Sequence, residues 1–185
     1  MKLRHIPGSN LLFDMGSQAV NDYAGEIPQL DLRLYLNGPV VGSGAFFGFG
    51  GRLVRRFTIS MQGDWNGDNG VIEERFRYHD GEEGTRCWNM NFAKGGAFTA
   101  TANDVTGQAK GLQSGNASLM RYKIRIPRGQ GEITVSMEDW FFLMEDGTLL
   151  NRARMTKFGL KVGEVIASFQ KVDNSSPLDL QENAQ

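Results

Sequence analysis

The chain has 185 residues, a formal net charge of −1 and a single cysteine. A chain of this length suits one domain with its own core. Basic and acidic residues are interspersed, which argues against a nucleic-acid partner and against a polybasic arm. One cysteine excludes an intrachain disulfide, and Cys87, flanked by Arg86 and Trp88, is expected to be a buried or half-buried strand residue.

No apolar run approaches the roughly 18 residues that a membrane-crossing helix needs, so no transmembrane segment is predicted. Residues 1–10 have no apolar core of signal-peptide length, and the chain as written is expected in the cytoplasm. The two histidines lie far apart and no cysteine pair exists, so neither a metal site nor a cofactor is predicted.

The first thirty residues, 1–30, show no clean periodicity and are expected to form an irregular segment that covers the domain. Leucines then alternate with other residues from Leu32 to Leu36, which predicts a strand. Residues 40–49 follow as a glycine-rich aromatic strand, and glycine inside a strand often marks a bend, as at a barrel corner.

Most of the remaining chain alternates apolar and polar residues with a period of two. Residues 139–165 form the clearest example, because they read as three strands joined by two tight turns. Glu145-Asp146-Gly147 suits the first turn, since Asp and Gly tolerate the positive φ that such a turn demands. Lys157-Phe158-Gly159 suits the second.

About ten strands at a spacing of roughly 8 to 14 residues, without a helical period, predict an all-β, antiparallel up-and-down sheet. Such a sheet tends to close because closure removes exposed edges, so a lipocalin-like (calycin-like) barrel over residues 31–172 is expected. A barrel of this size can hold one small ligand. A two-sheet sandwich is the alternative, and residues 173–185 are expected to be a disordered tail.

Several charged or polar residues fall on the strand phase that also carries large apolar residues, so they are expected to point inward. They are Arg55, Glu74, Arg86, Asp139, Asn151 and Lys157, with Arg152 adjacent, and Trp88 and Tyr122 belong to the same interior. Such groups fit a polar floor that holds a ligand's carboxylate or hydroxyl in an apolar cavity. They equally fit an internal ion-pair network that only fixes strand register.

The chain resembles a bacterial family of unknown function whose members are often described as lipoproteins with a lipocalin-like fold. The resemblance covers about residues 13–171 and is most specific at Asn151-Arg152-Ala153-Arg154-Met155-Thr156-Lys157-Phe158-Gly159. Further matching stretches are Leu36-Asn37-Gly38-Pro39, Arg56-Phe57-Thr58, Gly63-Asp64-Trp65-Asn66-Gly67, Glu73-Glu74-Arg75-Phe76-Arg77-Tyr78, Asp104-Val105-Thr106-Gly107, Gly115-Asn116-Ala117 and Asp139-Trp140.

Members of that family are often encoded near cyclopropane-fatty-acid-synthase-like methyltransferases and other fatty-acyl-modifying proteins. The resemblance therefore implies a lipid or fatty-acyl ligand, by association. It also implies a periplasmic or membrane-anchored location for many members, whereas the sequence as written predicts neither a leader nor an N-terminal lipidation cysteine. No catalytic residues follow from it.

Three functions are compatible with these observations. The first is binding of a hydrophobic small molecule or fatty-acyl ligand in the barrel cavity, ancillary to lipid modification. The second is an enzyme of the isomerase, cyclase or hydratase type, with Glu74 or Asp139 as general acid/base. The third is a structural protein with a filled core, and a homodimer is compatible with each. A cavity with an unpaired carboxylate of raised pKa would favour the enzyme.

Overall fold

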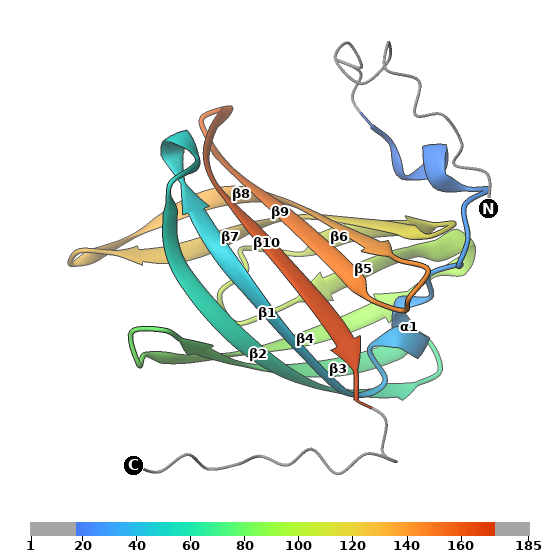
Figure 1. Ribbon diagram of the computed structural model, residues 1–185. Coiled ribbons are helices and arrows are strands. Elements are labelled where there is room, and N and C mark those ends of the chain that lie inside the picture. The colour runs from blue at the N-terminus through green and yellow to red at the C-terminus, as the bar shows by residue number, and fades with distance from the viewer. Residues whose placement is uncertain (1–17, 173–185) are drawn as a thin grey trace, which may run out of the picture.

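The computed structural model describes residues 18–172, which form one closed antiparallel barrel of ten strands (Figure 1). Each strand pairs with its neighbours in sequence, and β1 also pairs with β10, from Val40↔Lys171 to Gly48↔Gly163. The lipocalin-like up-and-down barrel is confirmed, and the sandwich alternative is wrong. The strands are β1 (Gly38–Gly48), β2 (Leu53–Asn66), β3 (Asn69–Tyr78), β4 (Glu83–Phe92), β5 (Ala97–Thr101), β6 (Ala109–Ser114), β7 (Ala117–Arg128), β8 (Gly131–Leu143), β9 (Leu149–Lys157) and β10 (Leu160–Lys171).

Alternating side chains give the barrel an apolar interior. In β2, for example, Ile59 and Met61 are buried while Thr58 and Ser60 are exposed. The same alternation corrects the expectation for Cys87, which is exposed because the residues on either side of it point inward. If a strand paired with its neighbour one residue out of register, its apolar side chains would face solvent and its polar ones the interior. Burial of the apolar side chains therefore fixes the register of each strand.

The glycines of β1 let aromatic rings from neighbouring strands lie against its backbone. A Cβ atom on Gly42 would stand 2.4 Å from the Phe169 ring, and one on Gly44 would stand 2.6 Å from the Phe57 ring. Both distances are far below van der Waals contact. Glycine in β1 therefore serves close packing of β1 against both of its neighbours, β10 and β2.

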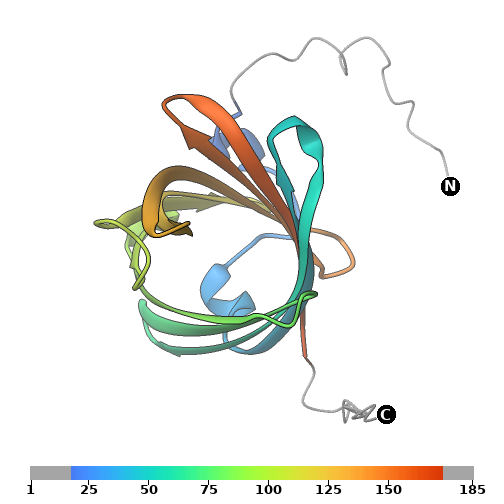
Figure 2. The ribbon, with the colours of Figure 1, turned by 90° about the vertical axis from the view of Figure 1, so that its left-hand side faces the viewer.

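A single helical turn, α1 (Leu32–Tyr35), closes one end of the barrel, which corrects the predicted strand over the same residues. Leu32 and Leu36 are both buried, and their spacing of four fits one face of a helix as well as one face of a strand. The Asp31 side chain caps the helix by accepting from the Arg33 backbone N–H at 2.9 Å. In Figure 2, α1 is seen through the opposite, open end.

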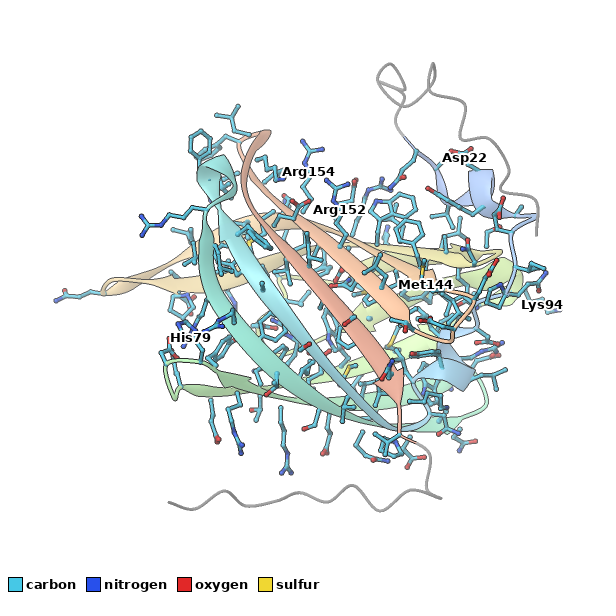
Figure 3. The ribbon with its side chains drawn as sticks, viewed as in Figure 1. Asp22, His79, Lys94, Met144, Arg152 and Arg154 are labelled. Carbon is cyan, nitrogen blue, oxygen red and sulfur yellow. The ribbon has the colours of Figure 1, made fainter. Side chains whose placement is uncertain are left out.

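Hydrogen bonds from Tyr35 attach α1 to the barrel wall. Its hydroxyl lies 2.9 Å from the Gly147 carbonyl, in the β8–β9 turn, and 3.0 Å from the Phe169 carbonyl. The β2–β3 and β8–β9 turns thus surround this closed end. The β1–β2, β3–β4, β7–β8 and β9–β10 turns surround the other end, which we call the mouth. Figure 3 labels His79 at the mouth and Met144 at the closed end.

The segment before α1 lies on the outside of the barrel. Its 3-10 turn, η1 (Val20–Tyr23), packs Val20 against Leu119 and Trp140 on the outer faces of β7 and β8. Two further 3-10 turns, η2 (Phe49–Gly51) and η3 (Lys94–Gly96), follow β1 and β4. Residues 1–17 of the predicted covering segment and the predicted tail, 173–185, lie outside the described residues. No helix within residues 18–172 is long and apolar enough to cross a membrane.

We expect Gly63→Ala to lower the free energy of unfolding by about 1–3 kcal/mol, the usual cost of overpacking. Gly63 is buried in β2 where α1 ends, and a Cβ atom there would lie 1.7 Å from the Leu36 carbonyl oxygen. Gly84→Ala in β4 is the matched control, because its nearest neighbour is the Tyr78 ring at 3.7 Å. Urea denaturation of both variants measures the difference, and equal midpoints would contradict the close contact.

Candidate ligand-binding site

The barrel encloses a cavity of about 450 Å³ that reaches the mouth. Its walls are mainly apolar and aromatic; among the lining side chains are Phe46, Phe57, Ile59, Phe76, Trp88, Ile124, Met137, Phe141 and Met155. The Trp88 and Tyr122 rings meet edge to face with centroids 5.4 Å apart. Small-molecule sites occupy roughly 300–1,000 Å³ and are lined in this way, with a few polar groups at chosen points.

The polar groups gather at mid-depth. We call Glu74, Arg86, Asp104, Tyr122, Asp139 and Asn151 the polar cluster; all of them line the cavity. On β3, Glu74 stands between Phe76 toward the mouth and Ile72 toward α1, and all three side chains face inward. The cluster is therefore a band around the middle of the cavity, with apolar walls on both sides, rather than the floor that was predicted.

Arg86 is held by two carboxylates. Its Nε lies 3.0 Å from Asp104 Oδ1 and one terminal nitrogen lies 2.7 Å from Asp104 Oδ2, a two-point contact. Its other terminal nitrogen lies 3.6 Å from Glu74 Oε2, beyond hydrogen-bond distance. Much of the charge of Arg86 is thus already matched by protein groups, while one side of its guanidinium still faces Glu74.

Glu74 is the unsatisfied member of the cluster. Its Oε2 atom is buried and has no hydrogen-bond partner. Burial raises the pKa of Glu74 from 4.5 to about 7, and the Asp139 charge adds to the rise while the Arg86 charge opposes it. Near neutral pH this carboxyl group is therefore present in both its neutral and its ionised form, as a general acid/base would be.

Asp139 is buried but fully hydrogen-bonded. Asn151 donates from Nδ2 to Asp139 Oδ1 and, at 3.1 Å, to the Trp140 carbonyl, while the Tyr122 hydroxyl donates to Asp139 Oδ2 at 3.2 Å. Burial raises the pKa of Asp139 to about 6, although both hydrogen bonds favour its ionised form. Burial and the Asp139 charge also raise the pKa of Tyr122, so its hydroxyl remains a donor.

A separate charged group lies at the mouth. Arg55 donates to Asp80 Oδ2 at 2.9 Å and also bonds Glu82, both in the β3–β4 turn, and its guanidinium stacks 3.6 Å from the centroid of the Tyr78 ring. Arg125 also lines the cavity there and donates to the Asn103 carbonyl. The mouth is thus more basic than the polar cluster, where three carboxyl groups surround one guanidinium.

The structure brings most of the predicted site residues into one cavity. Those that line it are Arg55, Glu74, Arg86, Trp88, Tyr122, Asp139 and Asn151. Arg152 and Lys157 do not line it, so the expected inward position of Lys157 and the expected ligand contact of Arg152, the neighbour of Asn151, are both corrected. Arg152 is exposed on the outer face of β9, where it bonds Glu164 at 2.6 Å, and Figure 3 shows it pointing away from the barrel. Lys157, at the end of β9, donates to the Thr134 carbonyl at 2.6 Å.

Sequence reasoning missed Asp104, the principal partner of Arg86. Asp104 belongs to the loop between β5 and β6, and strand periodicity gives no information about where a loop side chain points. The unpaired inward arginine was itself a signal, because a buried guanidinium requires an acidic partner. The loop motif Asp104-Val105-Thr106-Gly107 offered the nearest unassigned carboxylate.

A closed up-and-down barrel with an apolar cavity and a few convergent polar groups defines a lipocalin-like β-barrel with a candidate ligand site. Residues 9–171 match the model of a family described as a protein of unknown function, DUF3833, and the chain belongs to that family. No curated protein matches the chain.

Proposed function

We propose that this protein binds a hydrophobic small molecule with a fatty-acyl-like chain inside the barrel, ancillary to lipid modification. The observation that supports this most is the cavity of about 450 Å³, whose wall is mainly apolar and which opens at one end. A structural barrel would fill this space with side chains, because protein interiors pack to crystal-like density. The link to lipid modification comes from the family resemblance alone.

The polar cluster favours a ligand whose polar end is uncharged. Three carboxyl groups share one guanidinium there, and a further carboxylate beside Glu74 and Asp139 would meet like charge. A hydroxyl group can instead donate to the unpartnered Glu74 Oε2, and an ester carbonyl can accept from Arg86. Fatty alcohols and acyl esters therefore fit this band better than free fatty acids do.

Three matched ligands test the proposal: dodecanol, methyl laurate and laurate, titrated by following the fluorescence of Trp88 in the cavity wall. Above pH 7 the alcohol and the ester are expected to bind about tenfold more tightly than the carboxylate, the worth of one charged contact. Protonation of Glu74 should reduce that difference as the pH falls below about 7. Laurate binding as tightly as dodecanol would point to Arg55 and Arg125 at the mouth instead.

A cavity-filling variant locates the bound molecule. Ala153 is buried and lines the cavity, so Ala153→Leu should weaken all three ligands together. Ala93→Leu, at an exposed position in the turn after β4, adds the same atoms outside the cavity and should leave the affinities unchanged. If neither parent nor variants bind any of the ligands, and native mass spectrometry of protein from its own host finds no bound molecule, the proposal fails.

The second candidate is an enzyme of the isomerase, cyclase or hydratase type, and one observation favours it. Glu74 is a buried carboxyl group whose Oε2 atom has no hydrogen-bond partner, burial raises its pKa to about 7, and it lines the cavity. Incubating the protein with a lipid extract and following the products by mass spectrometry distinguishes the two. A product that Glu74→Gln abolishes while it still binds dodecanol indicates catalysis, and unchanged lipids indicate binding alone.

A further inference from the structure

Two hairpin tips stand side by side at the mouth. They are residues 49–54, the β1–β2 turn with the start of β2, and residues 157–161, the β9–β10 turn with the adjoining ends of its strands; we call them the paired tips. Gly48 pairs with Gly163, so the two turns extend from the same point of the β1–β10 seam, and η2 contacts β10. In Figure 1 both tips rise at the upper left of the barrel.

The paired tips carry an unusual amount of exposed apolar surface. Phe49 is 86 % exposed, Phe158 is 92 % exposed and Leu160 is 72 % exposed, while about half of Leu53 and of Val54 is exposed. No other large hydrophobic residue in the described part of the chain is as exposed as the two phenylalanines. Single exposed apolar residues need no explanation, but two aromatic tips with three aliphatic neighbours do.

Backbone geometry makes Phe158 the most unusual of these residues. Lys157 pairs with Leu160, which leaves Phe158 and Gly159 as a two-residue loop with φ of 52° and 80°. Such a loop favours Asn-Gly, because both central residues need positive φ and a bulky side chain is disfavoured there. Phe158 is the non-glycine residue with positive φ among the described residues. The turn would form more readily with Asn, so folding does not explain this aromatic ring.

Charge distinguishes the paired tips from the rest of the molecule. They contain Arg52, Lys157 and Lys161 and no acidic residue, although the whole chain has a net charge of −1. Next to the tips, Glu164 of β10 pairs with Lys161 at 2.9 Å, and on the β3–β4 turn Asp80 and Glu82 are bound to Arg55. Exposed aromatic rings beside basic side chains are the combination that binds anionic membrane interfaces.

We propose that the paired tips dock on the surface of an anionic lipid bilayer, with Phe49 and Phe158 inserted at the level of the headgroups. Protruding tips suit a soft bilayer, whereas a rigid protein partner would have to offer two matching pockets. Phe46 and Arg55 of the same β1–β2 hairpin line the cavity, so docking sets the mouth against the lipid. The proposal goes beyond ligand binding, and it can hold or fail separately from it.

Flotation with vesicles tests the docking. The protein should float with vesicles of phosphatidylcholine and phosphatidylglycerol, less with phosphatidylcholine alone, and less as salt is raised. Phe49→Ser and Phe158→Asn should each weaken partitioning about tenfold, the worth of burying one phenylalanine side chain. Because Asn suits the Phe158 backbone, Phe158→Asn should unfold at the same or a higher temperature, which separates docking from stability.

The matched control is Leu34→Ser with Met144→Ser, which removes two exposed apolar residues at the closed end and should float as the parent does. The proposal is overturned if the parent protein floats with neither kind of vesicle. It is also overturned if the double variant, Phe49→Ser with Phe158→Asn, floats as well as the parent. Light scattering covers the remaining outcome: a parent dimer that these changes convert to monomer would make the paired tips a self-association surface and overturn bilayer docking.

Discussion

Replacing Arg86 with Met is expected to lower the free energy of unfolding at neutral pH by about 3–5 kcal/mol, the cost of removing one partner from a buried ion pair. The guanidinium contacts Asp104 at two points and lies 3.6 Å from Glu74 Oε2, and its side chain is only 20 % exposed. Met fills a similar volume, so the loss comes from the carboxyl groups left without a cation. Urea denaturation measures it.

The pH dependence and a surface variant separate this effect from loss of packing. The destabilisation should shrink at acid pH, where the carboxyl groups around residue 86 bind protons and no longer need a cation. Arg121→Met is the control: Arg121 bonds Glu138 at 2.9 Å on the outer face and is 60 % exposed, so its loss should cost less than about 1 kcal/mol. Equal losses in the two variants would mean that the polar cluster does not stabilise the fold through charge.

Glu74→Gln is expected to make the protein more stable than the parent above pH 7, by roughly 3 kcal/mol, from the conversion of a pKa difference into free energy. The pKa of Glu74 rises from 4.5 to about 7 on folding, so the folded state binds the proton more tightly. Stability of the parent therefore falls as the pH rises from about 4.5 to about 7, and the cost of the ionised form is fully present above that range. Gln cannot ionise and lacks this cost.

Denaturation curves measured across that pH range test the expectation. The parent and Glu74→Gln should be equally stable near the lower limit and should diverge as the pH rises. Asp139 contributes its own decrease between pH 3.8 and about 6, and this should remain in the variant. Glu138→Gln, which changes a carboxylate on the outer face of the same strand as Asp139, should follow the parent curve. If the stability of Glu74→Gln changed with pH in the same way as that of the parent, ionisation of a buried Glu74 would be ruled out as the cause of the parent's loss of stability.

Strand periodicity was sufficient to predict the barrel and the inward direction of most site residues. Glu74, Arg86 and Asp139 share their strand phases with large apolar residues, and a closed sheet has a single interior, so they had to meet. The turn at Phe158-Gly159 was likewise predictable, because it lies between two alternating segments and contains Gly.

Periodicity failed where other interactions decide the conformation. The leucines from 32 to 36 recur at every second residue, as in a strand, but Leu32 and Leu36 are also four residues apart, as on one face of a helix. The Asp31 cap and burial at the closed end of the barrel favour the helix. Lys157 stands at the end of β9, where the wall no longer encloses the cavity. Loop residues such as Asp104 do not alternate between two faces, so periodicity cannot predict where their side chains point. The two-point contact of Asp104 with Arg86 could be identified only from the three-dimensional structure.

The seam between β1 and β10 determines when this molecule can become a barrel. Val40 pairs with Lys171, so the first strand to leave the ribosome finds one of its two partners in the last strand made. Until then both β1 and β9 present an open edge that invites pairing with other chains. Contacts between residues so far apart in sequence also form slowly during folding. The order of synthesis therefore makes closure the final step, and a chain that stops before Leu160 would have edges that never close.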